Sequence, residues 1–326
     1  AKKIASHLGT NHSEIALTAD DAQKIIPNLA KIYSEPFGDS SQIPTHLVCR
    51  EARESGLTVA LTGDGGDELF GGYNRHFLGA RIQSLISKYP YWLKALTSSI
   101  INRVPVNSNG LALEKRQKLS AIIRNSNSIE DVYKVLTNCW NDVDSILLDC
   151  IDSSSENPFL TEQLPNAPSP EERIMLADLF LYLPNDILVK TDRASMAIGL
   201  ETRAPFLDPK VASLAWKTPK SLKIRRQNRM NIGKWPLRQI LNNYVPSNLM
   251  NRPKSGFSIP LGSWLKTSMR DWAEELLNPS LIRSQGYLNP EIIQQIWKEH
   301  LNGRADNYSK IWTILMWQSW LQEWHK

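Results

Sequence analysis

A chain of 326 residues with 41% hydrophobic and 22% charged side chains has the composition of a globular protein that can bury a sizeable core, as one large domain or two. The net charge of +5 is mild, and the only notable basic cluster, at residues 223–229, is thin support for a nucleic-acid-binding protein. A solvated hairpin, or a contact for an anionic small molecule, explains that cluster equally well.

The three cysteines favour a reducing environment. Cys49, Cys139 and Cys150 form no CxxC pair and leave one thiol over, which argues against a disulfide framework and against a structural zinc site. No apolar run approaches the ~20 residues of a membrane span, and the first residues lack the central apolar block of a signal peptide. We therefore expect a cytoplasmic protein with no membrane partner.

The first residues predict two helices separated by a strand. The chain opens on what reads as the end of a helix, capped by Gly9, and a strand is expected at Glu14–Leu17. Residues 19–33 then alternate apolar and polar side chains at helical spacing, with Pro27 as a kink.

A second helix is expected at residues 46–56, directly before a strand. The run LTVALT, residues 57–62, is apolar and partly β-branched, as in a buried strand. This βαβ-like order favours a parallel sheet with a ligand site at the carboxyl ends of its strands.

Helical patterns dominate the chain after residue 77. A polar stretch rich in Ser and Pro, residues 152–172, predicts an exposed linker or long loop. Five of the eleven tryptophans lie near the C-terminus, where packing of a terminal helix explains them better than ligand stacking. The predicted helices cover residues 77–102, 113–124, 129–140, 171–199, 208–217, 231–243 and 291–325.

The stretch TGDGGDELFGG, residues 62–72, follows the predicted strand and combines acids with glycines. A strand, a glycine-rich turn and a helix start bring backbone N–H groups together, which favours anions. The carboxylates repel a bare phosphate unless a metal ion lies between them. The stretch therefore indicates a site for a metal-bound phosphate ester or a strained pair of acids, with a plain tight turn as the alternative. Its place at a strand end favours a site.

Three separated motifs together resemble the asparagine synthetases of the glutamine-hydrolysing type, in their C-terminal synthetase domain. They are LTGDGGDELFGGY (61–73), YLPNDILVKTDRASMAIGLETRAPFLD (182–208), and KWPLRQIL with VPSNLMNRPKSGFSIPLGSWL (234–265). Their order and rough spacing fit that family over nearly the whole chain. One glycine–acid motif alone would be a weak signal, but three long motifs in order are a strong one.

The resemblance implies an α/β fold with a Rossmann-like ATP pyrophosphatase sheet, of the adenine nucleotide alpha hydrolase type, and a large, mostly helical remainder. The chain would form a single synthetase-type domain over residues 1–326. Residues 1–76 would be the nucleotide-binding α/β part and residues 77–326 the mainly helical part. Such enzymes use ATP and Mg²⁺ to adenylate the side-chain carboxylate of aspartate, and ammonia then displaces AMP to give the amide.

The resemblance also assigns roles within the glycine–acid motif. Asp67 is expected to hold Mg²⁺, while Thr62, Gly63 and Gly65 are expected to bind the nucleotide, largely through backbone atoms. Asp64 is expected beside the acyl-adenylate, where many family members carry the longer Glu. Pyrophosphate is a good leaving group only if its accumulating negative charge is met by Mg²⁺ and a cation.

Further candidates come from the other two motifs. Lys254 matches the family lysine that meets the phosphates, against the alternative of a solvated loop lysine. Lys190, Asp192 and Arg193 are expected to line or brace the cleft, with Arg193 a candidate for the substrate carboxylate and a mutual ion-pair network an equal alternative. Glu68 could orient its neighbours, although an acid that interacts with the helix dipole explains it better.

A last group of charged residues is interpreted as structural. Glu201, Arg203 and Asp208 fit a charge pair beneath the site better than a catalytic role.

Two parts of the family pattern do not occur in this sequence. It contains no N-terminal cysteine nucleophile and no SGGxDS-type phosphate loop. The sequence-based hypothesis is therefore an N-terminally truncated synthetase with an incomplete sheet and an exposed sheet edge. Such a fragment is expected to be inactive alone, and to associate with a missing N-terminal part or with itself.

Other functions stay open at this stage. An amidotransferase acting on another carboxylate, such as a sugar acid in polysaccharide assembly, fits the same motifs. A non-catalytic remnant that binds or regulates a partner synthetase would explain the missing phosphate loop. Nucleic-acid binding is the least supported, and we expect small-molecule substrates instead.

Overall fold

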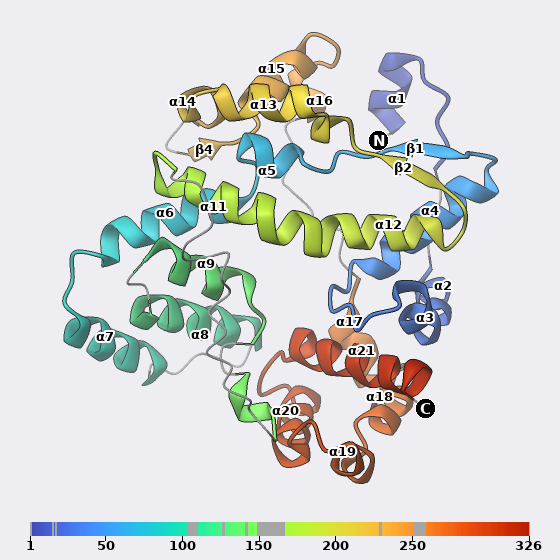
Figure 1. The fold of residues 1–326 in the computed structure, drawn as a ribbon, viewed down its shortest axis with the longest axis vertical. Helices are drawn as coiled ribbons and strands as arrows, with labels where there is room; N and C mark the ends of the chain where they lie inside the picture. The colour runs from blue at the N-terminus through green and yellow to red at the C-terminus, as the bar shows by residue number, and fades with distance from the viewer. Residues whose placement is uncertain are drawn as a thin grey trace. The chain divides into compact units, whose positions relative to one another are not determined.

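The computed structural model is mostly helical with small sheets (Figure 1). It describes the chain except for residues 1, 15, 17, 104–109, 126–127, 141–142, 149–166, 228–229, 251–258 and 326. The chain forms two compact units, each assembled from separate stretches. Unit 1 comprises Ala1–Ile26, Ser41–Phe77 and Ala167–Ser258, and unit 2 comprises Pro27–Ser40, Leu78–Asn166 and Ile259–Lys326. The division expected at residue 76 stays a prediction.

The N-terminal helices follow the sequence pattern more closely than the first strand does. Helix α1 (Lys2–Leu8) ends at Gly9, which takes the left-handed conformation with φ of 64°. Helix α2 (Ala19–Ile25) begins with a capping box between Thr18 and Asp21. The strand expected at residues 14–17 is not found at residues 14 and 16, while 15 and 17 lie outside the described residues.

Pro27 interrupts the predicted helix at residues 19–33, as expected. Helix α2 gives way to the 3₁₀ turn η1 (Ile26–Asn28), and α3 (Leu29–Tyr33) continues beyond it. The missing N–H and fixed φ of proline account for this break.

In unit 1, the helix and the strand predicted before the glycine–acid motif are confirmed as elements, but the expected burial of the strand is wrong, since Val59 and Leu61 are 39% and 73% exposed. Helix α4 (Gln42–Glu54) precedes β1 (Val59–Leu61), and the short helix α5 (Gly66–Phe70) follows. Strand β1 pairs in parallel with β2 (Glu201–Arg203), residue Ala60 opposite Thr202. In the described part of the chain this sheet has two strands, so a Rossmann-like sheet stays a proposal.

A long helical run in unit 1 changes its winding in the middle. Helix α11 (Pro170–Ala177) passes into the π-helix η3 (Asp178–Ile187), and α12 (Leu188–Met196) continues it. Pro184 lies inside the π segment. Wider π winding is typically found at functional sites, and here it accommodates a residue that cannot donate an α-helical hydrogen bond.

The rest of unit 1 covers the turn after β1. The 3₁₀ turn η4 (Pro205–Leu207) and α13 (Pro209–Lys217) follow β2, and Leu69, Phe70 and Ala215 form a buried cluster between α5 and α13. The remaining elements are α14 (Lys220–Lys223), β3 (Arg225–Gln227), β4 (Met230–Ile232), α15 (Trp235–Asn242) and α16 (Ser247–Met250).

The basic cluster at residues 223–229 lies largely in an antiparallel hairpin. Strands β3 and β4 pair with Arg226 opposite Asn231, which agrees with the solvated-hairpin interpretation. The helix predicted from residue 231 instead begins at Trp235, because residues 231 and 232 belong to β4.

Unit 2 contains a helical hairpin. Helix α6 (Asn74–Ile86) enters it from unit 1, and α7 (Tyr91–Arg103) then packs along α8 (Gly110–Asn125) (Figure 1). The helix predicted at 77–102 is therefore two helices, divided before Pro90. Helix α9 (Ile129–Thr137) packs on α8, and the 3₁₀ turn η2 (Asp144–Ile146) follows.

The C-terminal helices form the core of unit 2. They are α17 (Leu261–Lys266), α18 (Arg270–Leu276), α19 (Pro279–Gln285), α20 (Pro290–Leu301) and α21 (Tyr308–Trp324). Trp297 and Trp312 are buried, and the indole N–H of Trp324 donates to the carbonyl oxygen of Ala30 at 3.1 Å. These three tryptophans thus serve packing and anchoring. None of the helices in the described part of the chain combines the length and hydropathy of a membrane span.

Candidate active site

Strand pairing in unit 1 brings two of the three sequence motifs together. The β1–β2 ladder continues past β1, because the backbone N–H of Thr62 donates to the carbonyl oxygen of Arg203 at 2.8 Å. The glycine–acid turn after Thr62 and the residues around Ala204 therefore leave the same edge of the sheet. A site at this edge can draw on both motifs.

Only glycine fits at position 65, because the backbone conformation is left-handed and the neighbouring side chain leaves no room for a Cβ. Its φ is 84°, in the left-handed region that favours glycine, and a Cβ here would overlap the side chain of Leu207. The turn is thus pressed against η4, and α5 starts immediately afterwards with Asp67 and Glu68 in its first turn. Acids in this position interact favourably with the helix dipole.

Asp67 makes an ion pair with a lysine of the third motif. The Nζ atom of Lys234 lies 2.8 Å from Oδ2 of Asp67, and both side chains are about a quarter to a third exposed. The expected metal ligand is therefore held by a cation that the sequence analysis did not single out. Lys234 is the first residue of the KWPLR motif, and no local pattern distinguishes it from a solvated lysine.

The backbone conformation at Lys234 positions its side chain for this ion pair. Its φ of 56° is left-handed, and its N–H donates to the carbonyl oxygen of Phe70 at 2.9 Å. The preceding Gly233 lies so close to Gly71 that a Cβ would overlap the Gly71 carbonyl oxygen. A strained lysine beside a glycine contact persists only where the surrounding structure holds it.

A cavity of about 400 Å³ opens beside the turn. Its polar walls carry the hydroxyls of three threonines and the charges of two aspartates and one arginine, whereas the π-helix and α12 supply apolar walls. The lining residues are Thr62, Asp64, Pro184, Leu188, Val189, Thr191, Asp192, Arg193, Thr202 and Ala204.

Asp64 faces this cavity, where α12 supplies its hydrogen-bond donor. The hydroxyl of Thr191 shares its one proton between Oδ2 of Asp64, at 3.3 Å, and the carbonyl oxygen of Ile187, at 3.0 Å. The bond to Asp64 is long, so the carboxylate keeps capacity to bind another donor.

The structure separates the three candidates on α12. Asp192 and Arg193 line the cavity. Lys190 is buried outside the lining, with its Nζ 3.5 Å from Oδ1 of Asp186. Lys254, the remaining catalytic candidate, lies outside the described residues. The structure thus brings Thr62, Asp64, Asp192 and Arg193 together around one cavity.

Glu68 is buried beneath the turn. The hydroxyl of Tyr73 donates to its Oε1 at 2.8 Å. Burial raises the pKa of Glu68 above its ordinary value, and the Tyr73 hydrogen bond opposes that rise in part. Burial likewise raises the pKa of Tyr73, and the Glu68 carboxylate acts in the same direction. The hydrogen bond between Tyr73 and Glu68 therefore stabilises the first turn of α5.

A second buried acid, Asp178, fixes the residues that follow the motif. The Nε atom of Arg75 lies 2.9 Å from both carboxylate oxygens, and Nε2 of His76 lies 2.7 Å from Oδ2. The Arg75 guanidinium also lies over the rings of Tyr73 and Tyr182, at 4.0 and 4.4 Å. Asp178 stands at the start of the π-helix, so this cluster ties the start of α6 and the turn before it to η3.

The charge pair expected beneath the site lies on the surface instead. Arg203 and Glu201 pair at 2.8 Å with both side chains more than half exposed. Asp208 is structural, since its carboxylate caps α13 by accepting from the N–H of Lys210 at 2.8 Å.

The donor set can hold Mg²⁺ only with the help of a ligand. The described residues contain no group of three or more His, Cys, Asp or Glu side chains that could bind a metal ion. Mg²⁺ bound to a nucleotide usually takes one or two carboxylates and several phosphate oxygens. Asp67 fits that one-carboxylate role.

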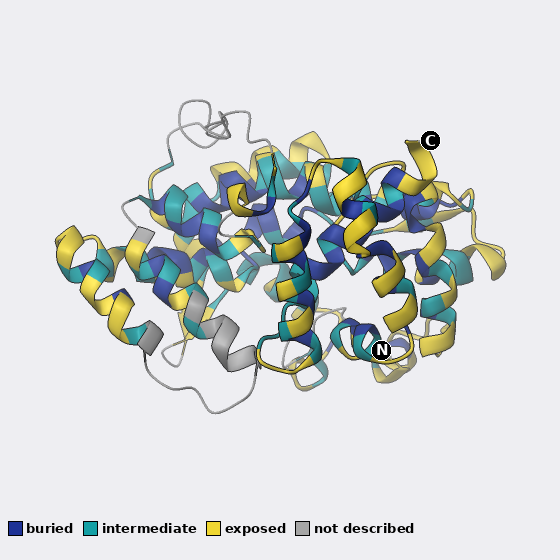
Figure 2. Cartoon of the chain, turned by 90° about the horizontal axis from the view of Figure 1, so that it is seen from below, coloured by how far each residue is buried: buried dark blue, intermediate teal, exposed yellow. Residues whose placement is uncertain are grey.

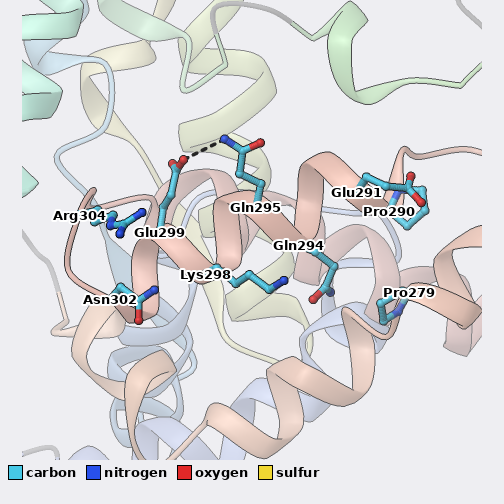
Figure 3. Close-up of a pocket in the computed structure, with 9 residues that line it drawn as sticks. All are labelled: Pro279, Pro290, Glu291, Gln294, Gln295, Lys298, Glu299, Asn302 and Arg304. Carbon is cyan, nitrogen blue, oxygen red and sulfur yellow. Dashed lines mark hydrogen bonds between the residues drawn. The ribbon is translucent and has the colours of Figure 1, made fainter.

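Unit 2 holds a larger cavity, of about 550 Å³, that contains none of the motif residues (Figure 3). Its polar groups lie mostly on α20, and two of them are hydrogen-bonded. Gln295 donates to Glu299 at 3.0 Å, and Gln294 donates to the backbone carbonyl oxygen of Leu277 at 2.7 Å. The lining residues are Pro279, Pro290, Glu291, Gln294, Gln295, Lys298, Glu299, Asn302 and Arg304. The chemistry of the motifs points to the unit 1 cavity.

Comparison with known proteins agrees with the motifs. The family model for asparagine synthase matches residues 1–324. The chain belongs to the asparagine synthase family. It is 29% identical over 324 residues to asparagine synthetase [glutamine-hydrolyzing] 1 of Bacillus subtilis, which covers 98% of this chain and 49% of the relative. It is 29% identical over 166 residues to the human asparagine synthetase [glutamine-hydrolyzing], or 45% of this chain and 28% of the human protein.

The chain spans about half the length of the Bacillus relative that it matches. The asparagine synthase family consists of ATP-using carbon–nitrogen ligases.

Proposed function

We propose that this chain carries the carboxylate-activating site of an ATP-dependent amide-forming ligase, with the amino acid aspartate as the substrate. The observation that supports the substrate class is the charge of the unit 1 cavity, which combines Asp64 and Asp192 with Arg193. Two acids and one guanidinium complement a zwitterionic amino acid, which offers an ammonium and a carboxylate in addition to the reacting carboxylate.

The first half-reaction requires that the negative charge of the nucleotide and of the leaving pyrophosphate be neutralised. A carboxylate oxygen attacks the α-phosphorus of ATP, the acyl-adenylate forms, and pyrophosphate leaves. Lys234 would offset negative charge at the turn, while Thr62, Gly63 and Gly65 would present backbone groups to the nucleotide. Asp67 would hold Mg²⁺ together with phosphate oxygens, and the ion would neutralise charge on the leaving group. We assign phosphate contact to Lys254 from its motif.

In the second half-reaction ammonia attacks the acyl carbon and AMP leaves. The attacking nitrogen gives up a proton, and Asp64 is the carboxylate of the cavity that can accept it or orient the nucleophile. The Thr191 hydroxyl, which donates to Asp64, would keep that carboxylate oriented. We further propose that β1 and β2 belong to a Rossmann-like sheet.

The test is the binding of a stable aspartyl-adenylate analogue in which a sulfamoyl group replaces the phosphate. The sequence contains no SGGxDS-type loop. The analogue lacks the β- and γ-phosphates that such a loop would hold, so its affinity reports on this cavity alone. We expect saturable binding by calorimetry, and we expect Arg193→Gln to weaken it about tenfold or more. Glu201→Gln, an exposed change outside the cavity, is the control.

A deamino analogue tests the substrate class. If the cavity recognises an amino acid, removal of the α-amino group weakens binding, and Asp192→Asn abolishes the difference between the two analogues. Equal affinity for both analogues would instead favour a carboxylate without an amino group, such as a sugar acid. Failure of both analogues to bind would contradict the proposed function.

A further inference from the structure

Helix α7 exposes its most apolar line of residues. Trp92, Leu96 and Ile100 follow one another at intervals of four, so they form one stripe along the helix. Their side chains are 66%, 51% and 55% exposed. In Figure 2 exposed positions predominate along α7. A stripe of this kind normally faces a core.

The opposite line of α7 is polar and buried. Lys94 and Ser98 are 5% and 4% exposed, and Oγ of Ser98 lies 2.7 Å from Oγ of Ser120 on α8. The buried side of α7 thus includes polar groups, whereas Trp92, Leu96 and Ile100 lie outside. This departs from the pattern by which helices of soluble domains bury their apolar line.

Exposed apolar side chains also occur just before the stripe, at the end of α6, in the following turn and at the first residue of α7. Leu85, Tyr89 and Tyr91 are 59%, 55% and 60% exposed. Together with Trp92, Leu96 and Ile100 they form what we call the α7 face. Scattered exposed apolar residues are normal, but a contiguous set marks an interaction surface.

The segment that carries this face is basic, although not all of its charge lies on the face, since Lys94 is buried on the opposite line of α7. Residues 78–125 contain eight Lys or Arg and one Glu, a formal charge of +7, whereas the whole chain is +5 and the remainder is therefore −2. No acid occurs in residues 78–113. Arg81 and Lys88 are exposed beside the α7 face. These basic residues belong to three helices, α6, α7 and α8, and to the turn after α6, so they form no compact cluster in the sequence.

We propose that the α7 face docks on an anionic phospholipid surface. Aliphatic side chains beside Trp and Tyr, with lysine and arginine near them, are the composition of helices that lie in the membrane interface. The aliphatic groups enter the acyl boundary, the aromatic rings lie at the headgroups, and the basic residues meet the anionic lipid charge.

Charge and composition argue against two other partners of the α7 face, a second copy of this chain and a nucleic acid. A second copy of this chain on the same face would bring two sets of Arg81 and Lys88, and no acid from residues 78–113, into one interface. A nucleic acid would meet the charge but would leave Leu85, Leu96 and Ile100 without apolar partners. The earlier expectation of no membrane partner rested on the lack of a spanning segment, and a helix that lies on a membrane needs none.

The experiment is flotation of the full chain with vesicles of phosphatidylcholine, with and without an equal part of phosphatidylglycerol. We expect binding to the anionic vesicles only, weakened by salt. Leu96→Glu/Ile100→Glu should reduce binding roughly tenfold or more. The matched control is Leu214→Glu/Ile240→Glu, which changes two residues that are 65% and 56% exposed on α13 and α15 and should bind as the wild type does.

A second variant, Arg81→Glu/Lys88→Glu, leaves the stripe intact and should weaken binding to anionic vesicles by a similar factor. Circular dichroism confirms that each variant folds. The proposal fails if the wild type binds neither vesicle, if it binds both equally, or if the stripe variant floats as well as its control. It also fails if the stripe variant instead converts a dimer into a monomer in sedimentation, since a second copy would then cover the face.

Discussion

Lys234 holds its ammonium nitrogen 2.8 Å from a carboxylate oxygen of Asp67, although the two residues come from different sequence motifs. The lysine reaches that position from a left-handed backbone, beside the close contact of Gly233 with Gly71. Such a cation offsets the charge of the Asp67 carboxylate and can also offset charge that arrives with a nucleotide.

Replacement of Lys234 by methionine should therefore affect function more than stability. We expect a loss of roughly 1 kcal/mol in the free energy of unfolding, since the pair is partly exposed, and a fall of about tenfold or more in affinity for Mg²⁺–pyrophosphate. The matched control is Lys220→Met, which removes a similar ion pair with Glu171 at 2.9 Å. Equal affinities of both variants would contradict the role of Lys234.

Gly65 offers a test of the packed turn. Gly65→Ala incurs the left-handed backbone cost of about 1–2 kcal/mol and, in addition, an overlap with Leu207 worth about 1–3 kcal/mol. Gly56→Ala has the same backbone problem, with φ of 89°, but a Cβ there would meet no atom within 4 Å. Urea unfolding should show Gly65→Ala to be the more destabilised, and equal losses would argue against the Leu207 contact.

Glu68 predicts a pH dependence of stability. Its folded-state pKa lies above the ordinary value of 4.5, chiefly through burial. The folded protein therefore binds this proton more tightly than the unfolded chain does, so its contribution to stability falls as pH rises from 4.5 towards the folded pKa. Glu68→Gln should remove that decline, so the variant gains on the wild type across this window.

Tyr73→Phe provides the second arm of this test. Loss of the hydroxyl that donates to Glu68 should raise the Glu68 pKa further and extend the decline to higher pH. Urea unfolding across the pH range measures both effects. Parallel stability curves for the wild type and both variants would show that Glu68 does not titrate as proposed.

Asp178 should be a major stabilising residue. Asp178→Asn keeps the size of the side chain but leaves Arg75 and the buried His76 without their shared carboxylate. Removal of one partner from a buried ionic cluster costs about 3–5 kcal/mol. Asp208→Asn, at the exposed cap of α13, should change the unfolding free energy by less than about 0.5 kcal/mol because Asn caps as well as Asp. Similar losses in both variants would refute the proposed importance of the cluster.

The sequence pattern predicted those parts of the site that depend on residues close together in the chain. The apolar run before Thr62 and the glycines after it gave the strand and the helix start, because periodicity and turn chemistry act over a few residues. Strand β2 was missed, since it is three residues long with no alternating pattern of its own, and it is defined by pairing with β1.

Long-range contacts escaped the sequence analysis for a related reason. Nothing near Lys234 indicates that Asp67 will be its partner, and Asp178 looks like an ordinary helical acid. The placement of Lys190 shows the limit of motif reasoning. Lys190 lies outside the cavity lining and pairs with Asp186, one turn earlier, although Arg193, three residues further on, lines the cavity.

The most direct test of the account is hydrogen–deuterium exchange with and without the aspartyl-adenylate analogue. We predict slower exchange in residues 59–68 and 184–204, whose side chains and backbone surround the unit 1 cavity. The unit 2 cavity, at residues 290–304, should exchange unchanged. Protection confined to residues 290–304, or no protection with saturating analogue, would contradict the assignment of the active site.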